Sequence, residues 1–106
     1  MFSGGDYSEV GRWLWNFVEA HAKRENLRVE ALVDEAGARE GKSYGVRLRL
    51  AERLLPPADQ AALEMTYADV AAGKGQLAWC DALAVRVRTL AGGFGAPSWM
   101  QVRKTS

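Results

Sequence analysis

The sequence predicts an α+β domain in the order helix, strand, strand, third strand, helix, with both helices packed on one face of a small antiparallel sheet. Two observations carry this prediction. Residues 27–55 contain two runs in which apolar and charged side chains alternate, as in strands that have one buried and one solvated face. Apolar residues recur at helical spacing before and after these runs, around residues 7–25 and 76–90, which is typical of amphipathic helices.

The first helix is expected over residues 7–25. Asp6 or Ser8 is able to cap this helix, and Glu9 follows Asp6 at the spacing of a capping box. Asn26 is suited to end this helix in the left-handed conformation, with Leu27 making the hydrophobic contact just beyond it. One stripe of the helix gathers its apolar side chains and the single histidine: Val10, Trp13, Leu14, Phe17, Val18 and His21.

The parity of the two alternating runs predicts how their strands pair. Core residues are odd-numbered in the first strand and even-numbered in the second, and opposed residues share a face, so paired numbers must add to an odd total. A total of 79 sets Glu30 against Arg49, whereas totals of 77 and 81 would oppose two arginines. We therefore expect a total of 79. The solvated face of the second strand is then expected to carry three arginines: Arg47, Arg49 and Arg53.

The stretch after the second strand permits two structures. Pro56-Pro57 is expected to end that strand, because proline cannot donate to the ladder. Residues 58–72 are rich in alanine, which favours a helix, yet the alternation around Met65 indicates a strand over 62–68. A third strand would cover one edge of the two-stranded ribbon. We therefore expect a strand there.

Residues 1–91 are expected to form a single α+β domain, with Gly73-Lys74-Gly75 as the break before the final helix. Residues 92–106 are expected to form a glycine-rich linker and an apolar C-terminal tail. Trp99 and Met100 would leave a large apolar surface exposed. The tail is therefore expected to dock onto a protein surface.

Composition excludes several classes of function. The net charge is +1, so no global charge attracts the chain to nucleic acid or to an anionic membrane. A single cysteine cannot form an intramolecular disulfide. The N-terminus lacks the pattern of a signal peptide, and no apolar run approaches the ~18 residues that indicate a membrane span. We expect a cytoplasmic protein without membrane contact.

No motif for catalysis, for a cofactor or for a metal is found. His21 permits a role as a buried base, but packing near a helix C-terminus, where a cation is favoured, is the simpler interpretation. Cys80 permits a reactive thiol, although a free cysteine on a buried helix face usually acts as a small hydrophobe. Gly73-Lys74-Gly75 lacks the spacing of a P-loop and the Ser or Thr after its lysine. We expect no enzyme, no cofactor and no metal site.

The order of a helix, three strands and a helix, with Gly73-Lys74-Gly75 opening the last helix, resembles the double-stranded-RNA-binding domain over about residues 8–90. The resemblance implies phosphate contacts from a lysine cluster at the start of the last helix. Here that stretch is Gln76-Leu77-Ala78-Trp79, with only Lys74 basic, so the departure falls on the RNA-contacting positions. Weak nucleic-acid binding is therefore the alternative function. Its candidate residues are Arg47, Arg49, Arg53 and Lys74.

Four tryptophans in 106 residues favour a function in protein contact. Trp15 lies among polar residues of the first helix, and exposed tryptophans are enriched at interfaces. We expect self-association, as a homodimer, or a role as an adaptor-like subunit. The expected interface residues are Trp15, Trp99, Met100 and Val102. A tail that folds back over Trp15 within one chain is the alternative.

Overall fold

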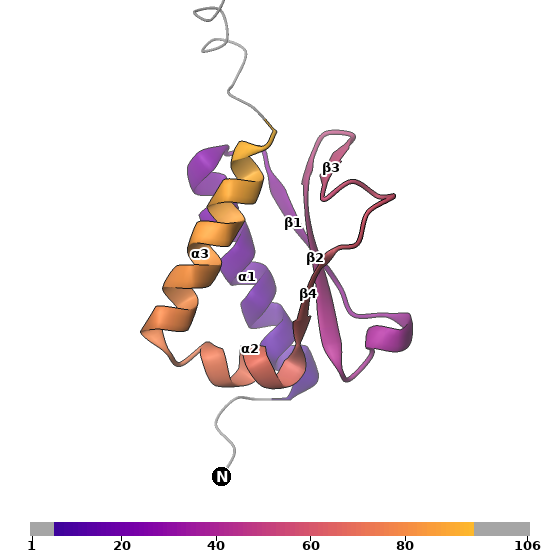
Figure 1. The fold of residues 1–106 in the computed structure, drawn as a ribbon, viewed down its shortest axis with the longest axis vertical. Helices are drawn as coiled ribbons and strands as arrows, with labels where there is room; N and C mark the ends of the chain where they lie inside the picture. Colours follow the sequence, from indigo (N-terminus) through magenta and orange to yellow (C-terminus); the bar gives the residue numbers. More distant parts are fainter. Residues whose placement is uncertain (1–5, 95–106) are drawn as a thin grey trace, which may run out of the picture.

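The computed structural model describes residues 6–94 and has two layers (Figure 1). Helices α1 (Tyr7–Glu25) and α3 (Leu77–Gly92) lie on one face of an antiparallel sheet, and the short helix α2 (Tyr67–Gly73) lies at one end of it. The sheet of this described region has four strands. The predicted α+β class, with helices packed on the sheet, is confirmed.

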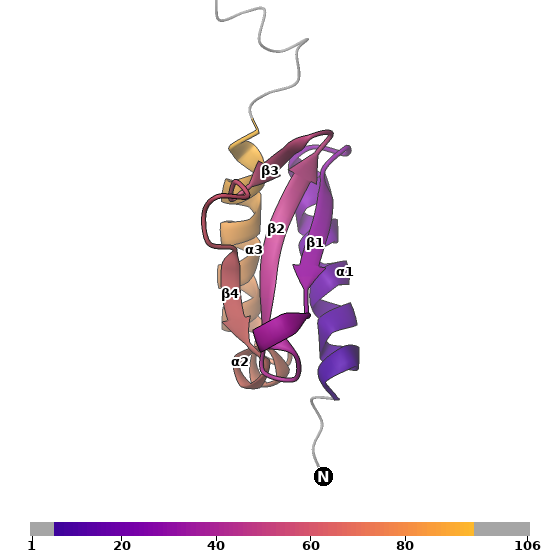
Figure 2. The ribbon, with the colours of Figure 1, turned by 90° about the vertical axis from the view of Figure 1, so that its right-hand side faces the viewer.

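The second strand, β2 (Ser43–Leu50), is the centre of the sheet (Figure 2). One of its edges pairs with β1 (Glu30–Asp34). Its other edge pairs with two short strands: β4 (Leu63–Thr66) along its first half and β3 (Arg53–Leu55) at its end. β2 therefore pairs with each of the other three strands.

The predicted register of β1 and β2 is confirmed. Glu30 lies opposite Arg49 and Ala31 opposite Leu48, which is the expected total of 79. On the side of β2 that faces the helices, Tyr44, Val46 and Leu48 are fully buried. Parity alone therefore identified the core face of these two strands.

The second strand does not continue to the two prolines. It ends at Leu50, and the chain reverses over Ala51 and Glu52 into β3. Ala51 has a φ of 56°, a conformation for which turns of this kind usually use glycine or asparagine. Arg53 is paired with Leu50 and shares its face. The prediction that Arg53 lies on one face with Arg47 and Arg49 is therefore wrong.

Residues 58–72 contain both of the structures that the sequence permitted. The strand predicted over 62–68 is present as β4, but it ends at Thr66, and α2 begins at Tyr67. Thr66 caps that helix, since its Oγ1 accepts a hydrogen bond from the backbone N–H of Asp69 at 3.1 Å. Thr66 is therefore both the last residue of β4 and the N-cap of α2.

The extent of α1 is as predicted, but the conformation of the residue that follows it is not. The side chain of Asp6 accepts from the backbone of Glu9 at 2.8 Å, and the side chain of Glu9 accepts from the backbone of Asp6, which completes the capping box. Asn26 is extended, with φ −156° and ψ 116°, instead of left-handed. Its Oδ1 accepts from the N–H of Arg28 and leads the chain toward β1. Leu27 is 80% exposed and makes no capping contact.

The corner between α2 and α3 depends on a glycine. Gly73 ends α2 and is buried, because the indole of Trp79 lies against it. A Cβ added at Gly73 would come within 2.1 Å of that ring. Gly75, two residues on, has nothing within 4 Å of the corresponding position.

We expect Gly73→Ala to lower the free energy of unfolding by about 1–3 kcal/mol, because the new methyl group overpacks against Trp79. Urea unfolding followed by circular dichroism measures this. Gly75→Ala is the matched control and should be neutral or slightly stabilising, since it only restricts the unfolded chain. Equal effects of the two substitutions would contradict this account of the corner.

Candidate functional site

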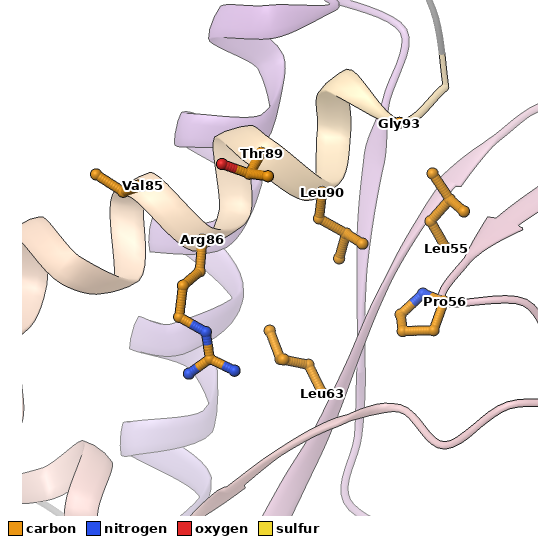
Figure 3. A pocket seen from close by; sticks show the side chains of 8 residues that line it. All are labelled: Leu55, Pro56, Leu63, Val85, Arg86, Thr89, Leu90 and Gly93. Atoms are coloured by element: carbon orange, nitrogen blue, oxygen red, sulfur yellow. The ribbon is translucent and has the colours of Figure 1, made fainter.

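An apolar cleft opens between α3 and the β3–β4 edge of the sheet (Figure 3). It arises because α3 packs mainly against α1 and makes few contacts with the strands. The cleft has a volume of about 420 Å³. Its lining residues are Leu55, Pro56, Leu63, Val85, Arg86, Thr89, Leu90 and Gly93.

The sheet wall of the cleft is a continuation of the core. Leu55 is paired with Leu48, and Leu63 is paired with Val46, so both leucines lie on the face of the sheet that is turned toward the helices. Figure 3 shows Leu90 of α3 directed toward these two leucines. All three are only partly buried. The core surface is therefore left open along this side of the molecule.

The helix wall of the cleft carries an exposed apolar residue and a cation. Val85 is 59% exposed, and Thr89 stands one helical turn further along. Arg86 is exposed between them, with its guanidinium directed along the cleft beside Leu63 (Figure 3). Such a cleft suits an apolar or aromatic side chain, which an arginine at the rim can cover.

The sequence did not identify this cleft. Its sheet wall depends on β3, whose residues the sequence predicts as the end of the second strand. One available signal was Val85, which falls outside the buried stripe of its helix. Exposed valines are common, however, and a single one carries little information.

Trp15 covers the free edge of β1. Its indole Nε1 donates a hydrogen bond to the carbonyl oxygen of Ala31 at 3.0 Å, while Glu19 accepts from the N–H of Ala31 at 2.9 Å. These two side chains, one helical turn apart on α1, satisfy backbone groups that an edge strand otherwise presents to another chain. Trp15 is still 40% exposed. Its predicted role in protein contact stays a prediction, as do the roles of Trp99, Met100 and Val102, which lie outside the described residues.

Arg47 holds the loop between β3 and β4 in place through hydrogen bonds. Its guanidinium donates to the carbonyl oxygens of Pro56 and Pro57, each at 2.7 Å, and to that of Gln60 at 2.8 Å. Arg47 lies where β2 has no strand partner on this edge, between the residues that pair with β4 and those that pair with β3. Its donors therefore replace ladder hydrogen bonds in holding the loop.

The other three residues predicted for nucleic-acid binding are Arg49, Arg53 and Lys74. Each has different neighbours from Arg47. Arg49 forms an ion pair with Glu30 on the outer face of the sheet. Arg53 donates to the carbonyl oxygen of Phe94 at 2.9 Å and lies 5.3 Å from the centre of its ring. Lys74 follows α2, at the opposite end of the sheet from β3 (Figure 1). The fold does not bring these residues together into one basic surface.

We expect Arg47→Met to lower the free energy of unfolding by about 1–3 kcal/mol, because it removes charged hydrogen bonds and leaves loop carbonyls without donors. Arg49→Met is the matched control on the same face. It breaks one exposed ion pair with Glu30, and such pairs contribute little to stability, so the free energy of unfolding should change little. Urea unfolding of both variants measures the two free energies of unfolding. Equal losses of stability in the two variants would contradict the structural role of Arg47.

His21 is placed as a packing residue. Its ring lies 4.4 Å from that of Phe17, and its Nδ1 is buried without a hydrogen-bond partner. Burial lowers the pKa of His21 below 6.5, and the nearby charges of Arg24 and Arg88 lower it further. The expectation that the helix C-terminus favours the cation is therefore wrong, because desolvation and two arginines outweigh the helix dipole.

The lowered pKa of His21 predicts a loss of stability in mild acid. Between the unfolded pKa near 6.5 and the lower folded pKa, the unfolded chain binds more protons, so the free energy of unfolding falls as the pH drops below 6.5. Glu30 and Glu64 also have lowered pKa values, but their contribution is lost only below about pH 4.5. Urea unfolding at pH 7.5 and 5.5 should show the loss in the wild type and not in His21→Gln. A wild-type free energy of unfolding that is the same at both pH values would contradict this prediction.

Cys80 is half-buried, and its Sγ lies 3.6 Å from the carbonyl oxygen of Gly73 and 3.7 Å from that of Lys74. The thiol therefore contacts the end of α2. Within residues 6–94, no group of three or more His, Cys, Asp or Glu side chains is placed to hold a metal ion. The same region contains no helix that is long and apolar enough to cross a membrane.

Comparison of the chain with protein-family models, with curated proteins and with solved structures found no match.

Proposed function

We propose that the protein acts through contacts with other protein chains, without catalysis, and that the cleft between α3 and the β3–β4 edge is its contact surface. The observation that carries this proposal is the open apolar core face formed by Leu55, Leu63 and Leu90. Burial of such a surface is favourable by about 25 cal/mol per Å². A partner segment that presents apolar side chains would gain this energy.

The first partner that we propose is a second copy of the same chain, which would make the protein a homo-oligomer. An adaptor role, in which the cleft takes an apolar segment of a different protein, uses the same surface. Grooves of this kind accept either an amphipathic helix or an extended segment. Both forms of the proposal require apolar contact, so binding should persist at high salt, whereas contacts to phosphate weaken steeply.

We expect the wild type to self-associate in the micromolar range and to remain associated in 1 M salt. Val85→Glu combined with Thr89→Glu should raise the dissociation constant at least about tenfold, equal to about 1.4 kcal/mol, because two charges would be desolvated in an apolar contact. Both positions are exposed, so the folded chain tolerates the change. Light scattering and sedimentation over a concentration series give the measurement.

The control places the same two charges elsewhere on α3. Leu77→Glu combined with Ala78→Glu alters exposed residues outside the cleft, and Leu77 is itself 77% exposed. This variant should associate like the wild type. A monomeric wild type at 100 μM, or equal weakening by both variants, would refute self-association through the cleft.

A further inference from the structure

We infer that the cleft is filled by the chain's own C-terminal segment, with Trp99 and Met100 inserted between α3 and the β3–β4 edge. The inference goes beyond the proposed function, since it names a segment of the chain itself as the occupant of the same cleft. It gives the apolar tail predicted from the sequence a surface on which to dock. That surface is composed entirely of described residues.

The segment begins beside the cleft. Gly93 lines it, and Phe94 is buried at its end, held by the Arg53 guanidinium that binds its carbonyl oxygen. The point at which the chain leaves the described domain is therefore fixed. Gly95 follows immediately, and glycine permits the change of direction that a return along α3 requires.

The segment has sufficient reach. An extended chain from Phe94 to Trp99 spans at most about 17 Å. From Gly93 back to Val85, α3 advances about 12 Å. Trp99 is therefore able to reach as far back along α3 as Val85, and Met100 and Val102 follow it in the sequence.

The chemistry of the segment matches that of the cleft. The lining is largely aliphatic, with Leu55, Leu63 and Leu90 at its centre. A tryptophan buries 150–250 Å² of surface, and methionine fills irregular apolar gaps. Arg86 at the rim is placed to cover an indole ring. A tethered segment also competes at a high effective concentration, in the millimolar range for a short linker.

The experiment uses the full-length chain with 5-fluorotryptophan in place of its four tryptophans. The ¹⁹F resonance of Trp99 is assigned as the one lost in Trp99→Phe. We expect this resonance to lie away from the position of free fluorotryptophan and to be shielded from solvent. In Val85→Glu with Thr89→Glu it should move to the free position. In Leu77→Glu with Ala78→Glu it should stay in place.

Light scattering on the same samples separates this inference from the proposed function. A shielded Trp99 in an associating protein supports both, with the segment supplied by a second copy. A shielded Trp99 in a monomer supports the inference and refutes self-association. A solvent-exposed Trp99 in the wild type, or a shielded one that the charges at Val85 and Thr89 do not release, overturns the inference, whatever the state of association.

Discussion

The pairing of β2 along both of its edges is the constraint on which the rest of the structure depends. Its inner side chains Tyr44, Val46 and Leu48 are fully buried, and a buried strand must have its backbone groups paired. One edge is paired by β1. The other is shared between β4 and β3, which pair with different parts of it. A buried central strand of this kind sets the position of every other strand.

The division of one edge between two short strands creates the need for Arg47. The chain must leave the sheet after β3 and return at β4, and the loop between them carries carbonyl groups that no ladder satisfies. Arg47 lies at this interruption and donates to three of those carbonyls. A planar guanidinium with five donors suits the task, whereas a lysine ammonium would not span them in the same fixed geometry.

The cleft is a consequence of how the two layers meet. α1 packs on β1, and α3 lies beside α1 on the β3–β4 side of the sheet (Figure 2), where it packs mainly against α1 and makes few contacts with the strands. Leu55 and Leu63 continue the core face of the sheet, and the cleft separates them from α3. In an antiparallel sheet with helices on one side, such an open wedge is where an additional segment gains most from burial.

The candidate site shows why residue type alone was a poor guide to role. Arg47, Arg49 and Arg53 share one parity in the sequence, which groups them on one face of a straight strand. The turn at Ala51 and Glu52 resets that parity, so Arg53 lies on the opposite face and binds Phe94. Trp15, which falls outside the buried stripe of α1, covers a strand edge and donates to Ala31. In each case a contact distant in the sequence decided the role.

The sequence by itself determined the α+β class, the capping box and extent of α1, and the pairing of β1 with β2. These follow from local chemistry and from side-chain periodicity, which act over a few residues and are visible in the order of amino acids. Only the tertiary structure decided the Ala51–Glu52 turn, the transition from β4 to α2 at Thr66, and the cleft beside α3. The physical reason is that Ala-Glu has no turn signature, so its conformation is imposed by the pairing of β3 with β2. The cleft, likewise, depends on where two layers stop touching, which no single segment encodes.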